Sequence, residues 1–169
     1  VLVTSMDFGE GWALYCEELM LEQGFNDSFE GRLAQLSDLM FRVVRVMADV
    51  KLSRGEIAPE EVAEMLVRET GMQRAAALSE AKSYTYCPTY YLSYFIGKLG
   101  LLQLLEDVKR VMGSRFSIKL FHDTLLYAGC LPIPFMRREM AMRLRQEYGI
   151  ELGGPRERLV EYALREAAR

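Results

Sequence analysis

Residues 27–50, with the sequence DSFEGRLAQLSDLMFRVVRVMADV, are the stretch that predicts the fold class. Asp27 followed by Glu30 has the form of a helix capping box. Beyond it, apolar side chains recur at helical spacing: Leu36, Met40, Val43, Val44, Met47 and Val50. Three polar residues fall on the opposite side: Arg42, Arg45 and Asp49. They form either a solvated face or, through an arginine, a clamp for a peptide carboxylate. The stretch predicts a long amphipathic helix.

Glycines and prolines divide the rest of the chain into further helical segments. A helix tends to stop at glycine, and proline suits its first turn. No alternating strand pattern of useful length interrupts these segments. The expected helices run from Asp7 to Gly24, Pro59 to Gly71, Met72 to Tyr86, Pro88 to Gly113, Ser117 to Gly129, Pro134 to Gly149, and Pro155 to the chain end. We therefore expect an all-α fold, an irregular multi-helix bundle that forms a single helical domain over residues 1–169.

Composition excludes several classes of partner. The net charge is -3 with acidic and basic residues intermixed, so no basic stripe is available for nucleic acid. No apolar run approaches the ~20 residues of a membrane-spanning helix, and we expect no membrane partner. Cys16, Cys87 and Cys130 lie far apart without CxxC spacing, which suggests neither disulfides nor a zinc knuckle. A reducing cytoplasm fits this cysteine usage.

The run from Gly9 to Glu17, GEGWALYCE, holds the first residues that could carry chemistry. Glu10 and Glu17 are seven residues apart, so on a helix both carboxylates lie on one side. Such a pair is usually a solvated face, and the alternative is a metal-facing edge. Glycine costs about 1 kcal/mol in a helix interior, so Gly9 and Gly11 indicate the close approach of another backbone or helix.

Three blocks of the sequence resemble one known family. The first is Glu-Gly-Trp-Ala-Leu-Tyr with a further Glu, at residues 10–17. The second runs from Pro88 to Gly97 and includes Ser93 and Tyr94, and the third starts with Phe-His-Asp at residues 121–123. In the same order, these blocks resemble the signatures of the bacterial and archaeal family called domain of unknown function 885.

The resemblance implies the C-terminal part of a larger, helical, zinc-peptidase-like fold acting on a peptide-like substrate. In that fold an HExxH-type helix supplies two histidines, and by analogy Glu10 is the third metal ligand. This chain has a single histidine, His122, and no HExxH. The resemblance therefore implies zinc in the parent protein and none bound to this chain alone. The histidine helix either lies in a missing N-terminal half, which would then be a partner, or has been lost.

Other site residues keep two interpretations each. By the resemblance Tyr94 could donate to an oxyanion, whereas Tyr84, Tyr86, Tyr90, Tyr91 and Tyr94 could equally form an aromatic packing layer. Glu17 either orients the site from behind the ligands or forms a surface ion pair. His122 beside Asp123 is either a structural residue or a substrate contact.

The competing function is a non-catalytic helical interaction domain with a degenerate peptidase fold. The missing histidine pair motivates it, as does Ser53, which stands where similar sequences commonly have a histidine. In either case the isolated chain should be inactive. We also expect it to self-associate, because the surface that meets the missing half would be exposed and partly apolar.

Overall fold

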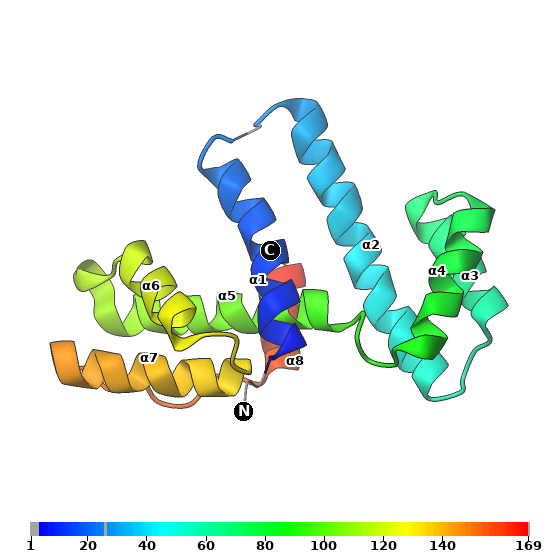
Figure 1. Ribbon diagram of the computed structural model, residues 1–169. Helices are drawn as coiled ribbons and strands as arrows, with labels where there is room; N and C mark the ends of the chain where they lie inside the picture. Colours follow the sequence, from blue (N-terminus) through cyan, green and yellow to red (C-terminus); the bar gives the residue numbers. More distant parts are fainter. Residues whose placement is uncertain (1–3, 26, 169) are drawn as a thin grey trace. The chain divides into compact units, whose positions relative to one another are not determined.

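The computed structural model describes residues 4–25 and 27–168 (Figure 1). Within these ranges the regular structure is helical throughout and contains no strand, which confirms the all-α prediction. The chain divides into two compact units. The central unit comprises Ala13–Ile96, and the terminal unit comprises Val1–Trp12 with Gly97–Arg169. The expectation of one domain over residues 1–169 stays a prediction.

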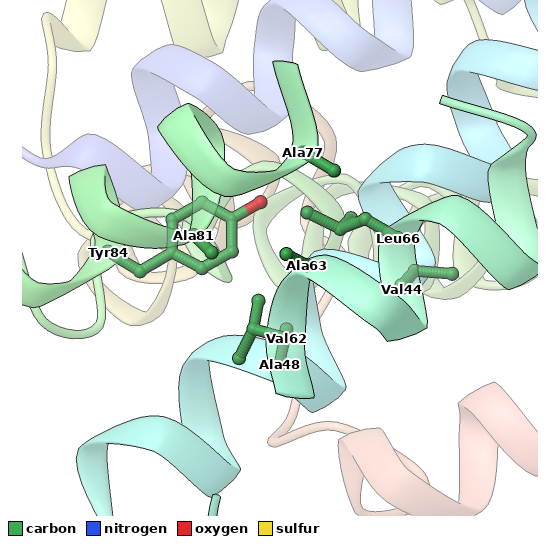
Figure 2. Close-up of a cluster of buried hydrophobic side chains, with 8 residues drawn as sticks. All are labelled: Val44, Ala48, Val62, Ala63, Leu66, Ala77, Ala81 and Tyr84. Carbon is green, nitrogen blue, oxygen red and sulfur yellow. The ribbon is translucent and has the colours of Figure 1, made fainter. Parts of the chain in front are cut away.

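The central unit is built mainly from three helices and the second half of another. Their bounds are α1 (Met6–Glu22), α2 (Phe29–Ser53), α3 (Pro59–Thr70) and α4 (Arg74–Tyr86). Helices α3 and α4 pack against each other and against α2. Eight side chains from these three helices form the core: Val44, Ala48, Val62, Ala63, Leu66, Ala77, Ala81 and Tyr84 (Figure 2). Four of the eight are alanines, whose small side chains let the helices approach closely around Leu66 and Tyr84.

The terminal unit takes the start of α1 together with most of α5 and the helices that follow. Their bounds are α5 (Ser93–Met112), the short 3₁₀ helix η1 (Gly113–Arg115), α6 (Ile118–Ala128), α7 (Ile133–Tyr148) and α8 (Leu159–Ala167). Buried Asp107 joins α5 to α7, because the Arg137 guanidinium donates to it at 2.6 Å. Arg165 joins α8 to α5 through Glu106 at 2.7 Å. Charge-assisted contacts therefore link the long helices of this unit.

The starts of α2 and α8 differ from the prediction. Helix α2 begins after Ser28, whose hydroxyl accepts the Gly31 backbone N–H at 3.0 Å, so the cap predicted at Asp27 is wrong by one residue. Serine serves this position as well as aspartate does. Helix α8 begins at Leu159 rather than at Pro155, and the Glu161 carboxylate accepts the Arg158 backbone N–H there. Both starts are fixed by which side chain reaches a free backbone N–H.

Helix α2 exposes most of its apolar side and buries most of its polar side, which is the reverse of the usual arrangement. Of its predicted apolar stripe, Val44 is buried, whereas Leu36, Met40, Met47 and Val50 are exposed. On the polar side Asp49 is fully buried, and the side chains of Arg42 and Arg45 are 19% and 11% exposed. The solvated-face interpretation of Arg42, Arg45 and Asp49 is therefore wrong. Helices α3 and α4 pack on the side of α2 that carries Val44 and Ala48, which leaves the exposed apolar residues uncovered.

Candidate functional site

Helices α1 and α5 come into backbone contact at two glycines of the terminal unit. A Cβ added to Gly11 would lie 2.4 Å from the backbone carbon of Gly97, and one added to Gly97 would lie 1.8 Å from the Asp7 carbonyl oxygen. No side chain fits at either position, since real Cβ contacts stay beyond about 3 Å. The close approach predicted at Gly11 is therefore confirmed, and it brings the second sequence block against the first.

A ring contact joins the third block to the same turn of α1. The His122 ring meets Trp12 edge-on, with centroids 5.3 Å apart, and the neighbouring Phe121 ring is 5.9 Å away. Burial lowers the pKa of His122, and the adjacent Asp123 carboxylate opposes that shift. Lys119 pairs with Asp123 one helical turn away. His122 is thus a partly buried imidazole held against Trp12.

Glu10 lies between these two contacts in the sequence. Its side chain is half-buried on α1, with Gly11 at the helix crossing directly after it and Trp12 one residue further. Among residues 4–25 and 27–168, no three His, Cys, Asp or Glu side chains are grouped so that they could hold a metal ion. In this chain Glu10 therefore offers one carboxylate donor.

Asp49 organises the loop between α4 and α5 in the central unit. Its carboxylate accepts the backbone N–H groups of Thr89 at 2.8 Å, Tyr91 at 3.1 Å and Leu92 at 3.3 Å. The Ser53 hydroxyl donates to the same carboxylate at 3.1 Å. A buried carboxylate with four donors is well satisfied and holds the loop in place.

The helix predicted from Pro88 begins only at Ser93, after the loop that Asp49 holds. Thr89 has a φ of +67°, a conformation that few residues other than glycine adopt. The three backbone N–H groups that Asp49 accepts are directed at α2 rather than along a helix axis. The predicted helix start at Pro88 is wrong because Thr89 adopts a left-handed conformation that interrupts a helix.

Arg45 lies at the centre of an aromatic cluster. Its guanidinium donates to Glu80 at 2.9 Å and to the Tyr84 hydroxyl at 3.3 Å. Aromatic rings surround it, with centroids between 4.3 and 5.9 Å from the guanidinium carbon: Phe41, Tyr84, Tyr91 and Tyr94. Such contacts stabilise a buried cation that also has a carboxylate partner. The sequence pattern predicts neither this cluster nor the burial of Arg45, since both alternatives for that face, a solvated surface and a carboxylate clamp, leave the guanidinium accessible.

Tyr94 belongs to this cluster. Its hydroxyl is 3.3 Å from that of Tyr90, and the two rings meet edge-on. Tyr91 packs against Tyr90 and Tyr84, whereas Tyr86 is 82% exposed and lies outside the layer. Four of the five tyrosines therefore form the aromatic layer given as one alternative.

Glu17 and Arg42 form a further pair in the central unit. The Arg42 guanidinium is 3.7 Å from the Glu17 carboxylate and 3.4 Å from that of Asp38. The ion-pair interpretation of Glu17 is thus observed.

Beside the pair is an open hollow of about 410 Å³ between α1 and α2, lined by Cys16, Glu17, Met20, Gln35 and Asp38 among others. Gln35 is buried there, and its Nε2 finds no hydrogen-bond acceptor among the residues that the structure describes.

The candidate residues thus fall into two groups. Glu10 and His122 belong to the terminal unit, and Glu17, Arg42, Asp49 and Tyr94 belong to the central unit.

The three cysteines are free thiols. No helix in the described part of the chain is long and apolar enough to cross a membrane. A buried lysine, Lys98, directly follows Gly97 and was missed because its apolar sequence neighbours mark only a core helix.

Comparison with known proteins gives one family and one related structure. The model of a family described as "Bacterial protein of unknown function (DUF885)" matches residues 1–140. The crystal structure of "the putative lipoprotein from Colwellia psychrerythraea" matches with a TM-score of 0.80 and 29% sequence identity over 84% of this chain. The match covers 24% of that protein, so this chain spans about a quarter of its length. No curated protein matches the chain.

Proposed function

This chain belongs to the DUF885 family of bacterial proteins of unknown function, and we propose that it is the C-terminal helical part of a zinc-dependent peptidase or amide hydrolase. The observation that supports this most is the meeting of the three sequence blocks at one turn of α1. Gly11 contacts Gly97, and Trp12 contacts His122. Glu10 directly precedes both contacts on a helix held firmly at its crossing, as a metal ligand must be.

The residues present fit only part of a zinc site. Glu10 can provide one carboxylate, and His122 is the single histidine of the chain, so a pair of histidine ligands must come from elsewhere in the full-length protein. Zinc, when bound, acts as a Lewis acid and lowers the pKa of water to about 7. Within this proposal Glu10 holds the metal and Tyr94 offers a phenol donor to a peptide-like substrate. Arg42 and Asp49 act within the central unit, where Arg42 pairs with Glu17 and Asp49 holds the loop before α5.

The deciding experiment measures zinc per molecule in the full-length protein that contains this chain. We expect about one zinc in the wild type, and a clear loss in Glu10→Ala with helicity unchanged. Glu17→Ala is the matched control, because it removes a carboxylate two turns along the same helix that is engaged with Arg42. Wild-type protein that takes up no zinc when the metal is offered, or Glu10→Ala that keeps its zinc, would reject the proposal.

A second candidate is a non-catalytic helical interaction domain. The exposed apolar side of α2 favours it, since such a surface marks an interaction site. The zinc measurement separates the two candidates, because an interaction domain needs no metal.

The cytoplasmic location also remains a proposal. The free thiols of Cys16, Cys87 and Cys130 are compatible with a reducing compartment. The Colwellia protein is described as a lipoprotein, which favours a membrane-anchored alternative for this chain's parent.

A further inference from the structure

A straight line of apolar side chains runs along α2, at alternating spacings of four and three residues. Its members are Phe29, Leu33, Leu36, Met40, Val43, Met47 and Val50, and we call them the α2 stripe. Six of the seven are exposed, by 38% to 78%, and Val43 is half-buried. Apolar side chains this exposed over a whole helix are unusual in a protein that needs no partner.

The stripe is not used by the core of its own unit. Helix α2 packs onto α3 and α4 through Val44 and Ala48, and its Asp49 holds the loop before α5. Ala48 and Asp49 lie on other sides of the helix from the stripe, and Val44 lies at its border, since successive residues turn by about 100°. The central unit is therefore packed while the stripe faces outward.

The spacing identifies the kind of partner. Alternation of four and three residues is a repeat of 3.5, which is the period of a left-handed coiled coil. In such a repeat Leu33, Met40 and Met47 take one set of core positions, and Phe29, Leu36, Val43 and Val50 take the other. Three heptads, about 33 Å of helix, are enough for a short coiled coil. The surface fits another helix with the same repeat.

Charges beside the stripe favour a second copy of α2, running antiparallel. With Met40 packed on the partner's Val43, Leu36 meets the partner's Met47 and Leu33 meets the partner's Val50. Exposed Glu30 and Lys51 flank the core at the same heptad position, three heptads apart. In this register each Glu30 faces the partner's Lys51, which gives two ion pairs per dimer. In a parallel pair Glu30 and Lys51 would lie at opposite ends.

We propose that this chain dimerises through the α2 stripe as an antiparallel coiled coil. The oligomeric state of the 169-residue chain tests this by sedimentation equilibrium over a wide concentration range. We expect a dimer in the wild type and a monomer of unchanged helicity in Met40→Glu, because two glutamates would be buried at the centre. Tyr127→Glu is the control: Tyr127 is 88% exposed on α6 of the terminal unit and is no member of the stripe, so this variant should still dimerise.

Charge reversal tests the orientation. Glu30→Lys should weaken the dimer roughly tenfold by replacing two attractions with two repulsions. Adding Lys51→Glu should restore the affinity, although the double variant carries unfavourable charges at both helix ends, so the recovery cannot come from helix stability. Neither zinc nor catalysis enters this test, so its outcome is independent of the proposed function.

Three results would overturn the proposal. A chain that remains monomeric at the highest concentration would leave the stripe to a helix elsewhere in a longer protein. A dimer that persists in Met40→Glu would place the contact on another surface. A dimer disrupted by Met40→Glu but not rescued by the double reversal would exclude the antiparallel register.

Discussion

At the scale of single residues, Asp49 shows how a polar side chain can hold a fold together. Three backbone N–H groups from residues 89–92 donate to one carboxylate. Each of these donors would cost about 1–3 kcal/mol if it were buried without an acceptor. The loop conformation, including the positive φ of Thr89, therefore depends on a residue 40 positions earlier in the chain. Arg45 likewise holds the tyrosine layer together through its contacts with Tyr84, Tyr91 and Tyr94.

His122 supplies a prediction at this scale, because it is the only imidazole in the chain. Burial lowers its pKa below the ordinary value of 6.5. The neutral form is thus favoured by folding, so the contribution of His122 to stability is present above pH 6.5 and is lost as the pH falls through the lowered pKa. An NMR titration of its single ring signal should give a pKa below 6.5 in the folded chain.

The chain denatured in urea is the reference, and the pKa of His122 in it should lie near the ordinary value. Asp123→Asn should lower the pKa of His122 further, since the Asp123 carboxylate raises it. A folded-state pKa at or above 6.5 would mean that His122 is more exposed to water than its contact with Trp12 implies.

At the scale of helices, the crossing of α1 and α5 depends on two glycines. Each lies where another backbone occupies the space of a Cβ. Glycine lowers the stability of a helix, and the close packing of α1 on α5 that these two glycines allow offsets this cost. The crossing places the turn that carries Glu10 against α5 without any intervening side chain.

Gly11→Ala should therefore destabilise the chain strongly, by about 3 kcal/mol or more, because its Cβ would overlap the Gly97 backbone. Gly9→Ala is a matched control two residues earlier on α1. Its Cβ would lie 3.7 Å from the Cys130 sulfur, an ordinary contact, so we expect no loss and a gain of up to about 1 kcal/mol. Urea unfolding of both variants gives the comparison, and equal effects would contradict the backbone-contact geometry.

At the scale of the whole molecule, the two compact units share two helices. Helices α1 and α5 each contribute residues to both units. A continuous helix couples the segments at its ends, because helix formation is cooperative. This favours the predicted single domain over residues 1–169.

Leu66→Ala tests that coupling. Leu66 is fully buried in the central unit, and its truncation should cost about 2–5 kcal/mol. Trp12, the single tryptophan, reports on the terminal unit by fluorescence. If the chain is one cooperative domain, the tryptophan transition should shift as far as the far-UV circular dichroism transition does. An unshifted tryptophan transition would establish two independent domains.

Sequence alone determined the helical class and most helix ends, since those depend on local chemistry. Gly71 and Gly149 end α3 and α7 in left-handed conformations, as their positions after apolar repeats predict. The pattern of α2 likewise predicted an amphipathic helix. Which face of α2 is buried was decided only by tertiary structure. The loop after α4 needs the Asp49 carboxylate, and α3 and α4 pack beside it, which leaves the apolar stripe outside. Helical periodicity separates two faces, but contacts between residues distant in sequence determine which of them is covered.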